Sequence, residues 1–154
     1  RSVYGIIRLK EIMSTRSLVR FAKREEGVSF SEHPEQVEVQ IYKHYDGYPE
    51  GHPTELAKFL KDFKVVNGVP FGVDNNRIAS GLDCLAAQYV AAFKTGPGDV
   101  YIENPDTQHG DIEYITYVWG DYGKGIWMSI FDTYEKECIF VGRPQELIDK
   151  YDTN

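Results

Sequence analysis

Cysteine is scarce in this sequence: there are two residues, Cys84 and Cys138, and no Cys-x-x-Cys motif. So few cysteines exclude a disulfide-stapled scaffold and a cysteine-based zinc module. No apolar run approaches the roughly 20 residues that a membrane-spanning helix needs. We therefore expect free thiols, a cytoplasmic location and no membrane partner.

The chain also lacks an excess of positive charge. Its 17 Lys and Arg residues stand against 24 Asp and Glu, which gives a formal net charge of -7. An acidic protein repels the phosphates of nucleic acids, so we expect no nucleic-acid partner. The one dense basic cluster is interpreted as the solvated face of a strand; it consists of Arg16, Arg20, Lys23 and Arg24.

What is present is ordinary globular composition. The 154 residues are 42% hydrophobic and 27% charged, which predicts one folded domain. We assign this domain to residues 13–154. Residues 1–12 are interpreted either as a leader or expression remnant or as a native edge strand, because the segment VYGIIRL within them is rich in β-forming residues.

Alternation and helical spacing predict the elements. SLVRFAK and VEVQIYK alternate with the period of a strand, and we expect them to pair in antiparallel fashion. An amphipathic stripe at Leu56, Phe59, Leu60 and Phe63 predicts a helix with Pro53 in its first turn. A second helix is expected to begin at a cap within residues 74–76 and to run from Ile78 to Phe93.

Four further β-rich runs follow: DVYIEN, DIEYITYVW, GIWMSIFDT and KECIFVG. Their connections, PDTQHG, GDYGKG and TYEK, are each typical of a hairpin. The segment RPQELIDKY predicts a short C-terminal helix. The expected fold is therefore α+β, a single domain with a mainly antiparallel sheet of about six strands, two central helices and a short C-terminal helix.

The segment YKHYDGYPEGHPTEL, residues 42–56, joins the second strand to the first helix and concentrates unusual residues. In one interpretation it is a corner in which the Asp46 carboxylate accepts hydrogen bonds from backbone N–H groups. In the other interpretation it belongs to a functional site. His44 and Asp46 form an H-x-D pair that recurs as His109 and Asp111.

Imidazoles and carboxylates are ligands for divalent metal ions. If the strand carrying Asp111 lay beside the strand carrying His44, five such side chains would converge: His44, Asp46, His52, His109 and Asp111. A metal held there would activate a water molecule for hydrolysis. No motif with a dedicated ligand spacing supports this set.

Cys84, near the start of the second helix, and His109 follow the residue order of papain-like amidases, which gives a third hypothesis. The simpler interpretation of Cys84 is a packed thiol on a face of small side chains. The late strands carry apolar or aromatic residues on both faces, including Trp119 and Trp127. One face must pack on the helices, and the other needs a second cover, a partner or a ligand.

The string HYDGYPEG, with the later segment LDCLAAQYVAAFK, resembles a family of short uncharacterised prokaryotic and phage proteins that carry the motif H-[YW]-D-G-Y-P. The likeness spans residues 37–131. It implies a microbial or viral cytoplasmic setting. It implies no catalytic or binding residue, since the family has no established activity.

From the sequence we predict a non-enzymatic binding or accessory module that needs no cofactor and engages a protein or small-molecule partner. The predicted binding residues are His44, Asp46, Tyr48, His52, Trp119 and Trp127. The alternative is a hydrolase dependent on a divalent metal at the five-residue set above. An open sheet edge would also allow a homodimer.

Overall fold

The computed structural model describes residues 14–24, 34–68, 77–121 and 125–153. Its elements are β1 (Ser17–Lys23), β2 (Gln36–Lys43), α2 (His52–Leu60), β3 (Lys64–Val66), β4 (Ile78–Ser80), α3 (Leu82–Phe93), β5 (Val100–Glu103), β6 (Tyr114–Asp121), β7 (Gly125–Asp132), β8 (Glu137–Gly142) and α4 (Pro144–Tyr151). The expected edge strand within residues 1–12 lies outside the described residues.

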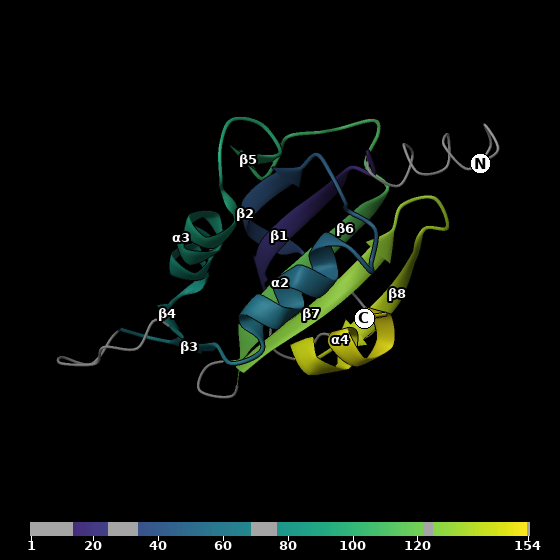
Figure 1. Cartoon of the computed structure of the whole chain (residues 1–154). Coiled ribbons are helices and arrows are strands. Elements are labelled where there is room, and N and C mark those ends of the chain that lie inside the picture. The colour runs from purple at the N-terminus through teal and green to yellow at the C-terminus, as the bar shows by residue number, and fades with distance from the viewer. Residues whose placement is uncertain (1–13, 25–33, 69–76, 122–124, 154) are drawn as a thin grey trace, which may run out of the picture.

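The α+β prediction is confirmed. A six-stranded sheet has the order β5-β2-β1-β6-β7-β8, and every neighbouring pair in it is antiparallel except β1 and β6 (Figure 1). The expected antiparallel pairing of β1 with β2, the hairpins joining β6, β7 and β8, and the C-terminal helix α4 are all present. Strands β3 and β4 form a separate two-stranded parallel sheet.

Two predictions about the elements are wrong. The segment PDTQHG is not a hairpin, because β5 pairs with β2 and β6 pairs with β1. The second helix begins at Leu82 and not at Ile78. Residues 78–80 instead pair with β3, and Gly81, at φ 86°, turns the chain into the helix with a backbone conformation that favours glycine.

The main core lies between the sheet and the three described helices, which cover the same face of the sheet (Figure 1). Alternation in β1 places Val19 and Phe21 on this face, where Tyr89 of α3 packs edge-on against Phe21. Leu56 of α2 and Leu147 of α4 are fully buried in the same cluster. Burial of each such large side chain stabilises the fold by about 1.5 to 3 kcal/mol.

The other face of the sheet carries a second, smaller apolar cluster. Ala22, Tyr117 and Trp119 are its buried members, and Ile115 and Phe131 pack against them. The prediction that the late strands are apolar on both faces is therefore confirmed. The candidate site described below lies on this second face.

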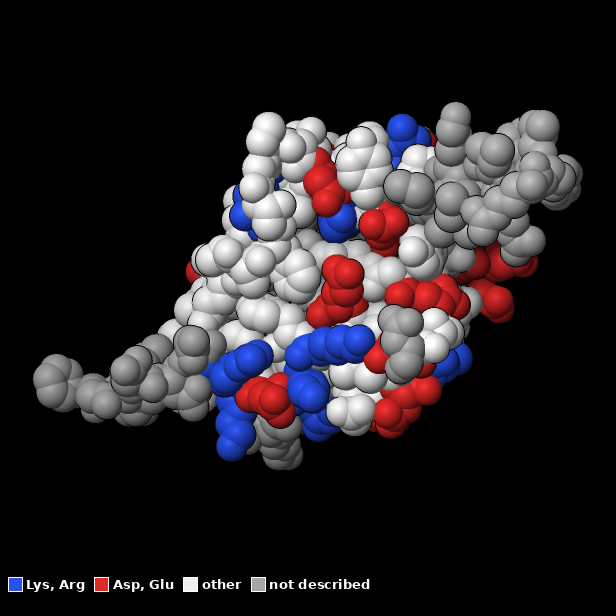
Figure 2. Space-filling model, viewed as in Figure 1, with Lys and Arg blue, Asp and Glu red and all other residues white. Residues whose placement is uncertain are grey.

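None of the described helices has the length and the apolar character that crossing a membrane requires. On the helix-covered face, the described Lys and Arg side chains are interspersed with Asp and Glu (Figure 2). The charges visible on that face are thus mixed in sign.

Candidate functional site

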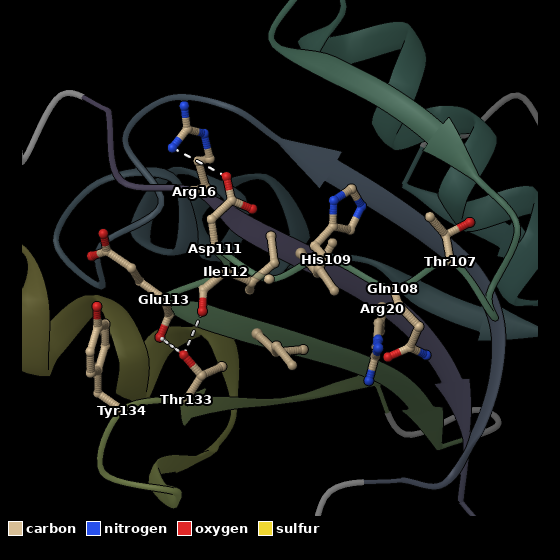
Figure 3. Close-up of a pocket in the computed structure, with 13 residues that line it drawn as sticks. Arg16, Arg20, Thr107, Gln108, His109, Asp111, Ile112, Glu113, Thr133 and Tyr134 are labelled. Atoms are coloured by element: carbon tan, nitrogen blue, oxygen red, sulfur yellow. Dashed lines mark hydrogen bonds and ion pairs between the residues drawn. The ribbon is translucent and has the colours of Figure 1, made fainter.

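A groove of about 600 Å³ opens on the second face of the sheet. Its base contains Leu18 of β1 and Ile115 of β6, which are direct neighbours in the parallel pair. The segment 107–113 forms one wall, and the turn at Thr133 and Tyr134 lies at one end (Figure 3). Its volume is within the range of roughly 300 to 1,000 Å³ that is typical of small-molecule sites.

The wall 107–113 is fixed at both ends by hydrogen bonds. At its start, the carbonyl oxygen of Thr107 accepts a hydrogen bond of 3.2 Å from the side-chain amide of Gln40. At its end, the N–H of Glu113 donates to the carbonyl oxygen of Arg16 at 2.9 Å. Because both ends are bonded to strands of the sheet or to their immediate flanks, the groove is formed before any ligand arrives.

The turn after β7 is tied to the same wall. The hydroxyl of Thr133 donates to the carbonyl oxygens of Ile112 and Glu113, as the dashed lines in Figure 3 show. The N–H of Thr133 also donates to the carbonyl oxygen of Glu113 at 3.1 Å. These bonds close one end of the groove.

A chain of polar side chains crosses four neighbouring strands at the groove. The Gln40 amide donates to Glu103 at 3.0 Å, and its oxygen accepts from Nε of Arg20 at 2.9 Å. Nη1 of Arg20 donates to the hydroxyl of Tyr117 at 2.9 Å. The four residues occupy paired positions on β5, β2, β1 and β6, so the strand register itself brings them together.

Tyr117 stays neutral in this network. Burial raises the pKa of its phenol, and the neighbouring Arg20 guanidinium opposes that shift without reversing it. Arg20 therefore hydrogen-bonds to two uncharged groups, Gln40 and Tyr117.

His109 connects the groove to the residues predicted from the sequence. Its Nε2 atom lies 2.8 Å from both carboxylate oxygens of Glu103, and its ring stacks on Tyr42 with centroids 4.7 Å apart. The Tyr42 hydroxyl lies 3.3 Å from Nδ1 of His44. Two of the predicted histidines, His44 and His109, thus contact the same tyrosine ring.

Asp111 forms an ion pair with Arg16, with Oδ2 and Nη1 3.2 Å apart (Figure 3). The Asp111 side chain is 52% exposed. Such an exposed pair contributes at most about 1 kcal/mol to stability, so its main effect is to balance charge beside the groove.

The corner at residues 44–52 is built from backbone contacts. Asp46 has φ 59°, and its carbonyl oxygen accepts a hydrogen bond of 2.7 Å from the N–H of His52. Gly47 fits against Ser17 so closely that a Cβ atom would lie 2.5 Å from the Ser17 side chain. Gly51 is equally confined, with the Asp46 carbonyl oxygen at 2.4 Å and the Tyr48 ring at 3.0 Å from such a Cβ.

The expectation that the Asp46 carboxylate accepts backbone hydrogen bonds is wrong. Asp46 is exposed, and among the described residues its carboxylate has no hydrogen-bond partner. Asp46 suits the corner because Asp tolerates the left-handed backbone conformation better than most residues. Tyr48 is half-buried, and burial raises the pKa of its phenol.

His52 is a core residue. It is 1% exposed, and its Nε2 atom lies 2.7 Å from the Tyr89 hydroxyl. The nearest acid, Glu55, is 3.9 Å from the other ring nitrogen, which is too far for a hydrogen bond. Burial lowers the pKa of His52, so the imidazole is neutral at pH 7.

An ion pair between Lys43 and Asp99 also stabilises this corner. The Lys43 ammonium, almost fully buried, donates to both oxygens of Asp99 at 2.7 Å and to the carbonyl oxygen of Tyr45 at 2.8 Å. Asp99 also accepts from the N–H of Tyr45 at 3.0 Å. The corner thus joins β2 to the segment before β5.

The structure does not bring the five predicted metal ligands together. His52 lies in the core, His109 pairs with Glu103, and Asp111 pairs with Arg16. Strand β6, which follows Asp111, lies beside β1. It does not lie beside β2, the strand that ends directly before His44. Across the described ranges, no three His, Cys, Asp or Glu side chains are grouped in a way that could hold a metal ion.

The Cys84–His109 pair of the amidase hypothesis is not formed. Cys84 lies on α3, which packs on the helix-covered face, and its thiol lies 3.6 Å from the Gln88 side-chain oxygen. His109 stacks on Tyr42, which is paired with Leu18 and faces the groove side. The sheet therefore separates the two residues.

Both predicted tryptophans have arginine over their rings. Arg24 lies 5.1 Å from the ring centroid of Trp119, which is 2% exposed, and Arg143 lies 4.1 Å from that of Trp127. Cation–π contacts of this kind stabilise the fold. The two rings do not line the groove.

The polar chain made by Arg20, Gln40, Glu103 and Tyr117 was not predicted from the sequence. A signal was present at Arg20, because it is a charged residue on the face of β1 that otherwise carries Leu18 and Ala22. The basic cluster was interpreted as solvated, but Arg20 is half-buried and Arg24 covers Trp119.

Comparisons of the chain with protein-family models, with curated proteins and with solved structures gave no match. The geometry of the groove is therefore the basis for the functional argument.

Proposed function

We propose that this protein is a non-enzymatic binding module that takes a small molecule into the groove between β1, β6 and the segment 107–113. The observation that carries the proposal is a groove of about 600 Å³ whose walls are hydrogen-bonded to the sheet. A pre-formed site avoids the entropic cost of ordering loops on binding. The absence of a catalytic motif from the sequence is the reason for proposing binding without chemistry.

The groove, and not the corner at residues 44–52, is the proposed site. His52 and Lys43 are buried by contacts that hold the corner together, and Gly47 and Gly51 are confined by neighbouring atoms. The separate environments of the five predicted ligands leave the metal-dependent hydrolase without geometric support in the described residues.

The test is ligand retention by a variant in which the groove is obstructed. Gly110 lines the groove, and a Cβ atom there would meet nothing within 4 Å, so Gly110→Trp adds bulk at a position with open space around its first side-chain atom. Gly96→Trp is the matched control, because Gly96 is equally open and lies outside the groove lining.

The three proteins are incubated with a small-molecule extract of cells and analysed by native mass spectrometry. We expect the wild type and Gly96→Trp to retain the same compound, with raised melting temperatures, since a ligand stabilises the folded state that binds it. Gly110→Trp should retain none of it. Equal retention by all three proteins would remove the groove as the site.

The remaining expectations from the sequence form part of the proposal. The string HYDGYPEG supports membership in the family with the H-[YW]-D-G-Y-P motif and a prokaryotic or phage origin. Cys84 and Cys138 are free thiols, which supports a reducing cytoplasm.

A homodimer is proposed through β5, which is an edge strand of the sheet. Its residues Tyr101 and Ile102 are 49% and 69% exposed, and edge strands with apolar side chains are templates for pairing. Analytical ultracentrifugation of the wild type and Ile102→Lys tests this. A wild-type monomer at all concentrations would contradict it.

A further inference from the structure

Resting on the proposed function, we infer that the groove recognises the acid group of a small organic anion, and that Arg20 is the residue that binds it. The acid is a carboxylate or a phosphate monoester, and an apolar part of the same molecule lies over Leu18 and Ile115.

Arg20 is held in a fixed position in the groove lining. Its Nε atom donates to Gln40, which is fully buried, and its Nη1 atom donates to Tyr117, which is 2% exposed. A guanidinium has five N–H donors in a rigid plane. The bonds to Gln40 and Tyr117 orient that plane and leave further N–H donors for a ligand.

The charge of Arg20 is not balanced by a carboxylate. In the residues that the structure describes, no Asp or Glu oxygen lies within ion-pair distance of its guanidinium. Two other cations differ: Arg16, which also lines the groove, pairs with Asp111 at 3.2 Å, and the buried Lys43 pairs with Asp99 at 2.7 Å. A half-buried cation without a counter-ion favours binding of an anion.

Glu103 is connected to Arg20 only through the uncharged side chain of Gln40. Gln40 donates its amide N–H to Glu103 and presents its carbonyl oxygen to Arg20, so the amide dipole points its negative end at the guanidinium. Glu103 itself is engaged by His109. This arrangement stabilises the orientation of Arg20 and leaves its positive charge available to the groove.

The surroundings limit the kind of anion. The base of the groove is apolar, with Leu18 and Ile115 beside Arg20. The acidic residues Asp111 and Glu113 also line it, and the whole chain has a net charge of -7. An extended polyanion would be repelled, whereas a compact molecule with one acid group and a hydrocarbon or aromatic body fits both features.

The experiment titrates ¹⁵N-labelled full-length protein with three probes of similar size: benzoate, phenyl phosphate and the neutral benzamide. Probes of this size are expected to have Kd values on the order of 1 mM. We expect saturable chemical-shift changes at the Arg20 side chain and in residues 107–113 with at least one acid. A preference for benzoate identifies a carboxylate, and a preference for phenyl phosphate identifies a phosphate. Benzamide should bind at least about tenfold more weakly, which is the loss expected for a charge-assisted bond pair.

Variants assign the preference to Arg20. Arg20→Gln should abolish the difference between the acid and benzamide, and Arg20→Lys should weaken acid binding because it keeps the charge and loses the planar fork. Lys61→Gln removes the same charge from an exposed position away from the groove and should bind the acid as the wild type does. If Arg20→Gln does not fold, the comparison of acid and benzamide on the wild type still tests whether the groove prefers an acid group.

The outcomes distinguish failure of the acid site from failure of the proposed binding function. Equal binding of benzamide and both acids in the groove would overturn the acid site and leave the proposed binding function standing. Saturable shifts located elsewhere, or none with any probe, would overturn both. Unchanged acid binding by Arg20→Gln would overturn the assignment to Arg20.

Discussion

The Nε2 atom of His52 lies 2.7 Å from the hydroxyl of Tyr89, in the core between α2 and α3. Burial raises the pKa of Tyr89 far above its usual value, so the phenol stays neutral and shares one hydrogen bond with the imidazole. The other ring nitrogen, Nδ1, lies 3.9 Å from Glu55. His52 therefore acts as a buried structural hydrogen-bond partner and not as a ligand.

Tyr89→Phe should destabilise the fold by about 1 to 3 kcal/mol, because it leaves the buried imidazole nitrogen without a partner. Urea unfolding monitored by fluorescence measures the change. Tyr134→Phe is the control, since Tyr134 is 82% exposed and its ring is not in the core. Equal stability of the two variants would show that the His52–Tyr89 bond contributes nothing.

Stability should fall as the pH decreases below about 6.5, the ordinary histidine pKa. Burial lowers the pKa of folded His52, so in that window the unfolded chain binds a proton that the folded chain does not. The free energy of unfolding then decreases by up to about 1.4 kcal/mol per pH unit until the folded pKa is reached. His52→Gln should reduce this slope, measured by urea unfolding between pH 7.5 and 5.5 (about one His titration range). An identical slope in the variant would contradict the assignment to His52.

Asp99→Asn should destabilise the protein by about 2 kcal/mol at pH 7, because it leaves the Lys43 ammonium buried without its counter-ion. This is less than for a fully buried pair, since the Asp99 side chain is 38% exposed. Asp106→Asn, at an exposed acid, is the control. Thermal unfolding compares the two, and equal melting temperatures would contradict the prediction.

The pH dependence of the same pair follows from the Asp99 pKa. Burial acts to raise it, but the hydrogen bonds from Lys43 and from the Tyr45 N–H outweigh burial and hold it below its usual value. The contribution of Asp99 is therefore present above the unfolded pKa of about 3.9 and is lost as the pH falls through the folded pKa. In Asp99→Asn this contribution to the fall in the free energy of unfolding at acid pH should be absent.

Gly47→Ala should destabilise the fold by about 2 kcal/mol or more, because its Cβ atom would lie 2.5 Å from Ser17 and 2.9 Å from the Thr15 carbonyl oxygen. Ser17→Gly in the same chain should restore part of the loss, since it removes the closer atoms. Gly96→Ala, where the space is open, should have no such effect. A melting temperature of Gly47→Ala equal to that of the wild type would show that the corner rearranges at no cost to accept the added methyl group.

Two substitutions of Asp46 distinguish an effect of its backbone conformation on stability from an effect of its carboxylate. Asp46→Ala should cost about 1 kcal/mol because alanine disfavours the left-handed conformation at φ 59°. Asp46→Gly should be neutral or stabilising relative to Ala, although it has no carboxylate. If Gly and Ala were equally destabilising in chemical unfolding, the carboxylate and not the backbone would be the cause.

The sequence by itself determined the class of the fold and most of its elements, but not the short strands β3 and β4. The alternation in β1 and β2, the stripe Leu56 to Phe63 and the two-faced late strands are local patterns, and local patterns report period and burial. The start of α3 was missed because the pairing of residues 78–80 with β3 overrides the helical pattern that includes Ile78.

The candidate site was decided only by the tertiary structure. Arg20 and Tyr117 are 97 residues apart in the chain, and Gln40 and Glu103 are 63 apart. They meet because the strands lie in the order β5-β2-β1-β6, with β1 parallel to β6, in a particular register. Strand order and register depend on pairing between distant segments and on the packing of whole faces, which a local pattern does not contain. For the same reason the recurring H-x-D pairs suggested a convergence that the sheet order does not allow.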